Sequence, residues 1–390
     1  MAQVINTNVM SLNAQRNLST SGSSLATSIQ RLSSGLRINS AKDDAAGLAI
    51  SERFTTQIRG LDVATRNAND GISLAQTAEG AMVEISNNLQ RIRELAVQSA
   101  NATNSDSDRK ALDSEVKQLT AEIDRVARQT NFNGTALLDG TFAGSLFQVG
   151  ADAGQTIGIN SITNARISQL GGAFFGTGTL TVAAGSANAS ATVSGVTLNS
   201  IAIDGVVAAF DTDIATTQKN AVTQMVTNIN ARMDQTGLYA EATSTAGEIK
   251  LTAIRASENA TTGAYAAITG AATGATFAAG AAPTTRSFVS NMDITSVIGS
   301  QQALSIVDKA LNSVNSARAD MGAIQNRFQS TIANLSTTSE NLSASRSRIR
   351  DTDYAKETAE LTRTQILQQA GTAMLSQANS STNSVLSLLK

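Results

Sequence analysis

The 390-residue chain contains no cysteine, no histidine and no tryptophan. These absences exclude disulfides, thiolate chemistry, imidazole acid–base catalysis and nearly every transition-metal site. Aromatic residues make up 3% of the chain, and Pro283 is its only proline. Small and polar residues dominate instead, which favours long thin helices over a large globular core. We therefore expect a structural protein that is not an enzyme, with no catalytic residues, no metal and no cofactor.

A large excess of one charge sign is also missing, since the chain has 29 basic and 31 acidic residues. No global field attracts nucleic acid or an acidic membrane surface. No apolar run approaches the length of a membrane span, and the first residues lack the features of a cleavable secretory signal. We expect no nucleic-acid partner, no membrane partner and, if the protein is secreted, a route that leaves its N-terminus uncut.

Glycine divides the chain into zones. Most of the 28 glycines fall between Gly134 and Gly299, whereas both flanks consist of helix formers. Pro283 lies where the middle returns to the second flank, as expected of a linker. In the middle, β-branched residues alternate with turn signals, which predicts strands and one helix. The predicted strands are 179–183, 191–193, 196–203 and 248–253, and the predicted helix is 216–233.

The N-terminal flank predicts three amphipathic helices from its apolar spacing. The seam of the first helix is Leu25, Ile29, Leu32 and Leu36. The second repeats every seven residues at Leu61, Ala68, Ala75, Met82, Leu89 and Ala96. The third, which Asp106 or Ser107 can cap, carries its stripe at Leu112, Val116, Leu119, Ile123 and Val126.

The C-terminal flank keeps a strict seven-residue spacing, which favours left-handed supercoiling against partner helices. Its members are Val307, Val314, Met321, Phe328, Leu335, Leu342 and Ile349. The last segment carries Ala355, Ala359, Ile366, Ala370 and Ala373 on one side. We expect the seams of both flanks to serve self-assembly. Because alanine seams bury little area, we expect the first and last ~40 residues to be disordered in the monomer and helical after assembly.

These zones predict a mainly α fold with an inserted α+β domain. The fold would combine a long antiparallel helical bundle, coiled-coil termini and a small β-rich outer domain. Residues 1–44 with 351–390 would form an inner terminal coiled-coil domain. Residues 45–170 with 286–350 would form a helical bundle with a β-hairpin region, and 171–285 a surface-exposed variable α+β domain.

Three local patterns resemble functional sites but have simpler explanations. The cluster at 42–44 lacks histidine and a second carboxylate pair, so a solvated loop is favoured over a metal site. The arginines of 346–350 have no aromatic stacking platform, which favours a salt-bridged surface over nucleic-acid binding. The glycines of 171–178 lack the Lys-Ser/Thr ending of a phosphate loop.

Several strings in the two flanks carry a specific resemblance to bacterial flagellin. They are MAQVINTN (1–8), LSSGLR (32–37), NSAKDDAAGLAI (39–50), RNANDGI (66–72), LQRIRELAV (89–97), NFNG (131–134), DY (353–354), QILQQAG (365–371) and VLSLL (385–389). The resemblance covers about residues 1–150 and 290–390. It implies a subunit that polymerises into the flagellar filament for swimming motility, and that is exported unfolded through the flagellum's own channel. Filament cap and hook-junction proteins are further implied partners, and an export chaperone would bind the segment 347–390.

The resemblance also implies recognition by Toll-like receptor 5 of hosts. The matching positions are Gln90, Arg91, Leu95 and Val97 on the second helix and Glu115 on the third. An exposed arginine beside an apolar anchor suits a binding hot spot. The alternative is that Leu95 packs inside the filament.

Two other classes of protein remain open at this level. A hook–filament junction protein shares the helical ends and the export route but does not form the long filament. An enzyme inserted in the middle, such as a metalloprotease, would need a His-Glu-x-x-His string, which the sequence lacks.

Overall fold

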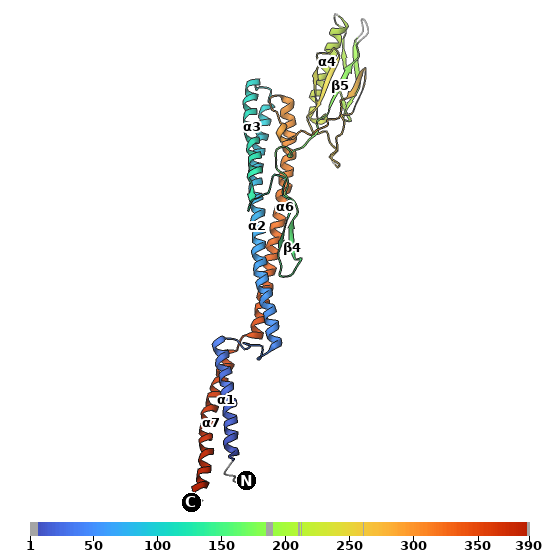
Figure 1. Cartoon of the computed structure of the whole chain (residues 1–390). Coiled ribbons are helices and arrows are strands. Elements are labelled where there is room, and N and C mark those ends of the chain that lie inside the picture. The colour runs from blue at the N-terminus through green and yellow to red at the C-terminus, as the bar shows by residue number, and fades with distance from the viewer. Residues whose placement is uncertain (1–6, 185–189, 210, 212, 260, 388–390) are drawn as a thin grey trace. The chain divides into compact units, whose positions relative to one another are not determined.

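Helices account for most of the described part of the chain, which comprises residues 7–184, 190–209, 211, 213–259 and 261–387 of a computed structural model (Figure 1). The described residues divide into two compact units. The first combines segments within 1–69, 147–157 and 329–390, and the second combines 70–146 and 158–328. Two long helices, α2 (Ala45–Ser99) and α6 (Val297–Arg350), contribute to both units. The predicted division into three domains stays a prediction.

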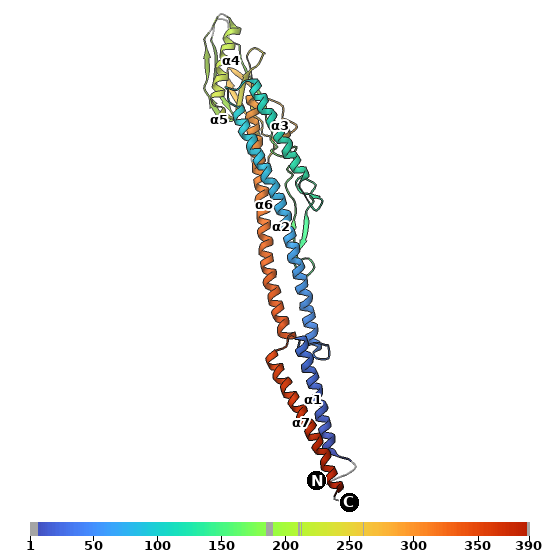
Figure 2. The same cartoon turned by 90° about the vertical axis from the view of Figure 1, so that its left-hand side faces the viewer.

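In the first unit, α1 (Val9–Ser34) and α7 (Tyr354–Ser387) lie side by side and antiparallel (Figures 1 and 2). The side chain of Asn8 caps the start of α1 by accepting a hydrogen bond from the backbone nitrogen of Ser11. Gly35 ends the helix with a φ of 70°, a conformation that costs glycine little because it has no Cβ. Leu36, predicted as the last seam residue of this helix, therefore lies beyond its end.

The rest of the first unit packs the start of α2 against the end of α6. Leu61, Ala64 and Leu335 form a small buried cluster, and Leu342 packs against it. Nearby, β3 (Ser145–Gln148) and β4 (Thr156–Ile159) form a two-stranded sheet. The Nδ2 of Asn67 on α2 donates to the carbonyl oxygen of Gln148 at 3.0 Å.

The second unit contains a bundle of α2, α3 (Asp106–Gln129) and α6. The heptad positions predicted from sequence supply its core, because Ala75, Met82, Leu89, Val314 and Phe328 are all buried. Ser105 caps α3 in a reciprocal capping box with Asp108, so the predicted caps at Asp106 and Ser107 were wrong by one or two residues. The cap must have an extended backbone, and Ser105 has it, with φ −75° and ψ 166°.

A set of buried hydrogen bonds joins the helices at one end of this bundle. Asp113 on α3 is 3% exposed, and its Oδ1 accepts a hydrogen bond from the backbone nitrogen of Ile294 at 3.2 Å. The carbonyl of Ile294 in turn accepts from the Ser99 hydroxyl at 2.6 Å and from the Ser300 hydroxyl at 3.2 Å. The segment before α6 is thereby tied to both α2 and α3.

A tight hairpin and a short turn precede and follow the inserted region. β1 (Asn131–Phe132) pairs with β2 (Thr135–Ala136). Asn133 and Gly134 join them with positive φ angles of 49° and 79°, as two-residue hairpin turns require. A 3-10 turn, Val289–Asn291, leads back toward α6.

The inserted region folds as two small antiparallel sheets and a covering helix around one core. One sheet has the order β12-β5-β10-β9, and the other has β11-β6-β7 with β8 also paired to β6. The helix α4 (Ile214–Ala231) contributes Val222, Met225 and Ile229 to the shared core. The strands are β5 (Thr177–Val182), β6 (Ala191–Leu198), β7 (Ile201–Ile203), β8 (Val206–Ala208), β9 (Leu238–Ala242), β10 (Glu248–Ala253), β11 (Gly270–Thr273) and β12 (Ala275–Ala279). The short helix α5 (Met233–Thr236) follows α4. The predicted mainly α fold with an α+β insertion is confirmed.

One outer edge of the first sheet is capped by a side chain. The Nδ2 of Asn230 on α4 donates to the carbonyl oxygen of Ala240 on β9 at 3.0 Å. The backbone nitrogen of Ala240 donates back to the Oδ1 of Asn230 at 2.8 Å. The amide thus satisfies a donor and an acceptor that an edge strand would otherwise leave open.

Candidate self-association surface of the terminal helices

The residues of α1 that meet α7 recur every three or four positions along the helix. The fully buried ones are small and polar. Ser11, Ser21 and Ser28 are its buried residues. Leu18, Leu25 and Leu32 are only half-buried between them. On α7 the corresponding face contains Glu357, Leu361, Thr364, Gln368, Gly371, Leu375 and Ala378. The two helices therefore meet across a thin seam that buries little apolar area.

Small residues allow this close approach. A Cβ built at Gly371 would lie 3.1 Å from the Cδ1 of Leu18, so a larger residue there would require the Leu18 side chain to shift. At the far end of the pair, the Nδ2 of Asn8 donates to the carbonyl oxygen of Ala378 at 2.9 Å. The hydroxyl of Ser11 donates to the side-chain oxygen of Asn379 at 2.9 Å.

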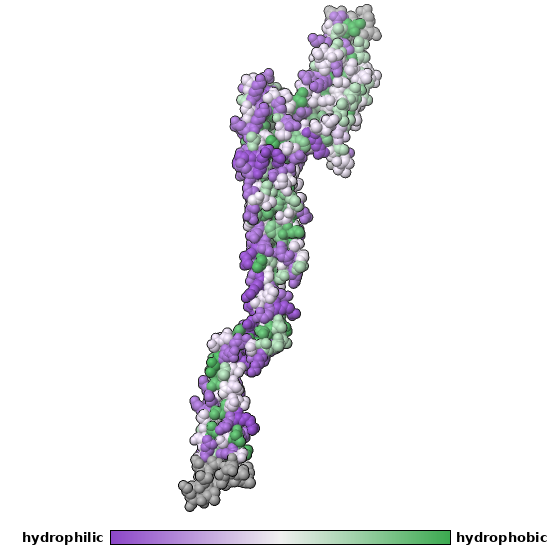
Figure 3. All heavy atoms as spheres, in the orientation of Figure 1, coloured by the Kyte–Doolittle hydropathy of each residue, from purple (hydrophilic) through white to green (hydrophobic). Residues whose placement is uncertain are grey.

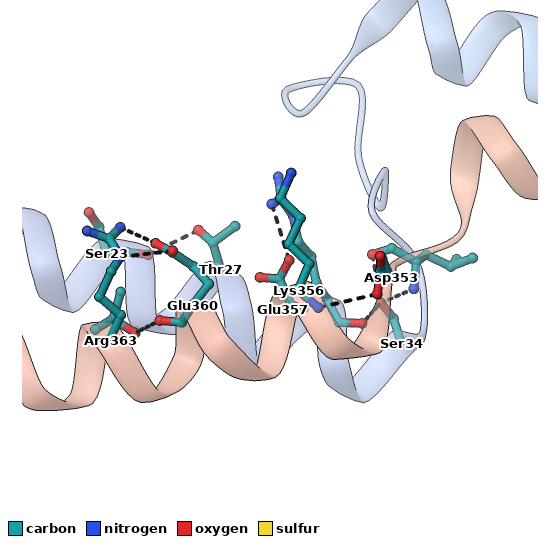
Figure 4. Close-up of polar contacts among 11 residues, drawn as sticks. Ser23, Thr27, Ser34, Asp353, Lys356, Glu357, Glu360 and Arg363 are labelled. Atoms are coloured by element: carbon teal, nitrogen blue, oxygen red, sulfur yellow. Dashed lines mark hydrogen bonds and ion pairs between the residues drawn. The ribbon is translucent and has the colours of Figure 1, made fainter.

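One ion pair crosses the seam. NH1 of Arg31 lies 3.8 Å from Oε2 of Glu357, and the Glu357 side chain is only 11% exposed. Glu360, one turn further along α7, is paired within its own helix to Arg363 (Figure 4). Hydrogen bonds from Arg363 hold the pKa of Glu360 below its ordinary value.

The sides of these helices that face away from the seam carry large apolar residues. Ile366 is 59% exposed and Met374 is 64% exposed. Val9, Met10, Leu12, Ile29 and Leu367 are exposed as well. Figure 3 shows the resulting apolar patches on the surface of the terminal helices. Soluble monomers rarely leave so many large apolar side chains open, and such surfaces mark sites of association.

The sequence-predicted seam of α7 lies on this outward side. Ala355, Ala359, Ile366, Ala370 and Ala373 are all exposed, while Glu357 and Thr364 face α1. Sequence spacing found the apolar stripe, but it did not reveal that a second, more polar stripe contacts the partner helix. Ile29 of α1 is likewise 52% exposed.

The other predicted assembly residues are placed inside a single chain. Leu61, Met82, Leu89, Val307, Val314, Met321, Phe328 and Leu335 are buried, and Leu342 and Ile349 are half-buried. Their apolar surface is already covered by the bundle of their own chain. In this conformation they hold one subunit together, and their part in self-assembly stays a prediction.

A backbone bridge ties the two connections that lead to the terminal helices. The backbone nitrogen of Arg37 donates to the carbonyl oxygen of Arg350 at 2.7 Å, and that of Thr352 donates to Gly35 at 3.0 Å. NH1 of Arg350 pairs with Glu52 at 3.1 Å. The connection from α1 to α2 and the connection from α6 to α7 are therefore hydrogen-bonded to each other.

The residues that resemble a receptor motif are only partly brought together. Arg91 on α2 donates from Nε to Oε1 of Glu115 on α3 at 3.0 Å, and from NH1 to Glu94 at 3.0 Å. These hydrogen bonds, first with Glu94 and then with Glu115, raise the pKa of Arg91. Gln90 and Val97 are exposed. Leu95 is 1% exposed, so in this conformation its side chain packs inside the chain, and its part in receptor binding stays a prediction.

No group of three or more acidic side chains among the described residues is placed to hold a metal ion. None of the helices of the described segments combines the length and the apolar character that a membrane crossing requires. Paired terminal helices with outward apolar faces define instead a structural protein built to associate with like helices.

Comparisons with known proteins identify the family. Residues 5–143 match the bacterial flagellin N-terminal helical region, and residues 304–389 match the bacterial flagellin C-terminal helical region. The chain is 44% identical over 395 residues to Flagellin D of Vibrio cholerae, covering 100% of both chains. It is 46% identical over 388 residues to Flagellin A of that species, covering 99% of each. The solved structure of FliC from Burkholderia pseudomallei is 27% identical, with a TM-score of 0.38 over 66% of this chain and 99% of that one.

The chain belongs to the bacterial flagellin family. Flagellins are structural subunits of the extracellular flagellar filament and are not enzymes. Identity along the whole chain favours this class over the hook–filament junction protein that the sequence left open.

Proposed function

We propose that this chain polymerises into the flagellar filament that drives swimming, and that the outward faces of α1 and α7 contact neighbouring copies. The observation that carries the proposal is the exposure of Val9, Leu12, Ile366 and Met374 on helices whose mutual contact buries serines and leaves its leucines only half-buried. A second copy of the chain supplies complementary helices at the high local concentration of a filament.

Order in the terminal helices would follow from assembly. Fixing one residue of backbone costs roughly 1–2 kcal/mol, and a seam of small side chains returns little of that free energy. Burying one large aliphatic side chain returns about 1.5–3 kcal/mol. Amide exchange should therefore be fast in residues 9–34 and 354–387 of dilute monomer and slow in filaments. Strong protection of both helices in dilute monomer would contradict this account.

Polymerisation of purified full-length chain tests the surface directly. Ile366→Ser should remove about 1.5–3 kcal/mol of burial per subunit and raise the critical concentration ~10- to 150-fold. Ile366→Leu conserves volume and polarity and serves as the matched control. Pelleting assays at several protein concentrations give the critical concentration of each variant. Equal values for the serine variant and the wild type would reject Ile366 as a contact residue.

The same exposed face suits the other partners that a flagellin needs. Before assembly, an export chaperone would cover the apolar side of α7 within the segment 347–390. The filament cap and the hook-junction proteins would contact the terminal helices at the two ends of the filament. A pull-down with purified chaperone should lose the complex when 347–390 is deleted and weaken when Ile366 and Met374 are both changed to serine. Mass spectrometry of assembled filaments should find an N-terminus without signal cleavage.

Recognition by Toll-like receptor 5 is a second candidate function, supported by the exposed pair of Arg91 and Glu115 on adjacent helices. Gln90 and Val97 flank this pair, whereas the Leu95 side chain is buried inside the chain. Soluble monomer with Arg91→Ala should lose most of its signalling in receptor reporter cells. Arg93→Ala is the matched control, because Arg93 pairs with Asp308 instead, at 2.7 Å. Equal losses in both variants would remove the special role of Arg91.

A further inference from the structure

The seam between α1 and α7 has a repeating pattern that does not by itself define one alignment. On α1, Leu18, Leu25 and Leu32 recur every seven residues, and on α7 Thr364, Gly371 and Ala378 do the same. Leu18 lies against Gly371 in this structure. Sliding α7 by one heptad would place Leu18 against Thr364, which again sets a leucine against a small side chain. Packing alone therefore separates the two alignments poorly.

Charge separates them much better. Within α1 the only charged residues are Arg16 and Arg31. In α7, no charged residue follows Arg363 along the chain. Arg16 is exposed on α1, whereas Arg31 meets Glu357 at 3.8 Å. After a slip of one heptad, Glu357 would lie opposite Leu25, with no cation of α1 opposite it. A buried carboxylate without a cation is strongly disfavoured.

The Arg31–Glu357 ion pair contributes little to the stability of the contact between α1 and α7. Among the described residues, Oε1 of Glu357 and Nε of Arg31 are buried and have no hydrogen-bond partner. Taking both charges out of water offsets most of their attraction. A polar contact in a helical seam can nevertheless select one alignment by penalising the others.

We propose that the Arg31–Glu357 pair is a positioning device that fixes the register of α1 against α7, and so fixes the stagger of their outward apolar faces. A slip of seven residues would displace Ile366 by ~10 Å along α1, because a helix rises 1.5 Å per residue. A neighbouring copy could then not match the outward residues of both helices at once. The inference rests on the proposed polymerisation for this consequence, whereas the register itself is measured separately, by disulfide formation between α1 and α7.

The absence of native cysteine allows the register to be read with engineered disulfides. A Cβ at position 371 lies 3.9 Å from that of Leu18, within the usual range for a disulfide. The pair Leu18→Cys with Gly371→Cys therefore reports the observed register, and Leu18→Cys with Thr364→Cys reports the slipped one. Each pair is placed in the full-length chain, oxidised before and after assembly, and quantified by mass spectrometry.

The native charges should favour the first disulfide over the second by at least about tenfold, and Glu357→Gln should reduce that ratio to about threefold or less. The charge swap Arg31→Glu with Glu357→Arg should restore it. Glu360→Gln, which changes a half-buried carboxylate one turn away that pairs with Arg363 of its own helix, should leave it unchanged. A ratio unaffected by Glu357→Gln would overturn the inference and assign the register to the backbone bridge at residues 35–37 and 350–352.

Assembly is measured on the same variants without the cysteines. Glu357→Gln should form fewer or irregular filaments, and the charge swap should recover them. If Glu357→Gln lowered the disulfide ratio but still formed filaments like those of the unmodified chain, the link between register and stagger would be overturned. Failure of the unmodified chain to form filaments would instead sink the proposed function, whatever the disulfides show.

Discussion

The contact between Gly71 on α2 and Phe328 on α6 yields a prediction in which one substitution reverses its effect. Phe328 is fully buried, and a Cβ built at Gly71 would lie 2.6 Å from the tip of its ring. Gly71→Ala therefore forces the ring out of place, which costs about 1–3 kcal/mol in a packed core. The gain from replacing a helical glycine by alanine is only about 1 kcal/mol. We expect Gly71→Ala to be destabilising or at best neutral.

Removing the ring changes the sign. Phe328→Ala should lower the free energy of unfolding by about 3–5 kcal/mol, because it leaves a cavity in the bundle. In that background the methyl group of Gly71→Ala enters empty space and keeps its helix preference. It should then stabilise the chain by about 1 kcal/mol. The double variant should therefore be about 1–3 kcal/mol more stable than the sum of the two single effects implies, which is a measurable coupling.

Urea unfolding of the four chains of this cycle, followed by far-ultraviolet circular dichroism, provides the measurement. Phe328→Leu serves as a control that refills most of the space. If Gly71→Ala changed stability by the same amount in both backgrounds, the reasoning from this close contact would be refuted.

Three further outcomes follow from polar groups and one strained turn. Asp113→Ala should lower the free energy of unfolding by about 1–3 kcal/mol, because it leaves the buried backbone nitrogen of Ile294 without an acceptor, while Asp113→Asn should cost less in the same urea titration. Hydrogen bonds from the side chain and then the backbone of Ser105 lower the pKa of Asp108. The Asp108 carboxylate therefore stabilises α3 fully above its unfolded pKa of about 3.9, and this stabilisation is lost as the pH falls through the lower pKa of the folded state. Asp108→Asn should flatten that acid dependence in pH-resolved unfolding curves. Gly35→Ala should cost about 1–2 kcal/mol at a φ of 70° and speed amide exchange at the backbone bridge, whereas an unchanged exchange rate would show that the bridge tolerates a side chain.

The long helices and their buried faces could be predicted from sequence because a seven-residue spacing has a direct physical meaning. A residue at Met82 or Val314 can reach the partner helix only if its whole stripe does. Both are buried as expected. The same logic did not identify the contact face of α7. The face that meets α1 contains Glu357, Thr364 and Gly371, and sequence spacing alone gives no reason to prefer it over the more apolar stripe of Ile366.

The inserted region was predicted where β-branched residues are dense and missed where they are not. The predicted strand at 196–203 is broken into β6 and β7, because Asn199 and Ser200 adopt positive φ angles of 50° and 66°. Strands β11 and β12 consist mostly of alanine, glycine and threonine, so they carry little signal of their own. Their pairing with β6 and β5 depends on contacts far apart along the chain.

The side-chain amide of Asn230 has a consequence that appears only when many subunits stand close together. A polymer displays the same outer strand at every subunit, at a local concentration far above that of free protein, which is the situation in which sheets from different molecules fuse. With one donor and one acceptor of β9 occupied at Ala240, that strand is a poor template for another chain. In the proposed filament, the inserted regions of neighbouring subunits would thus remain separate folding units.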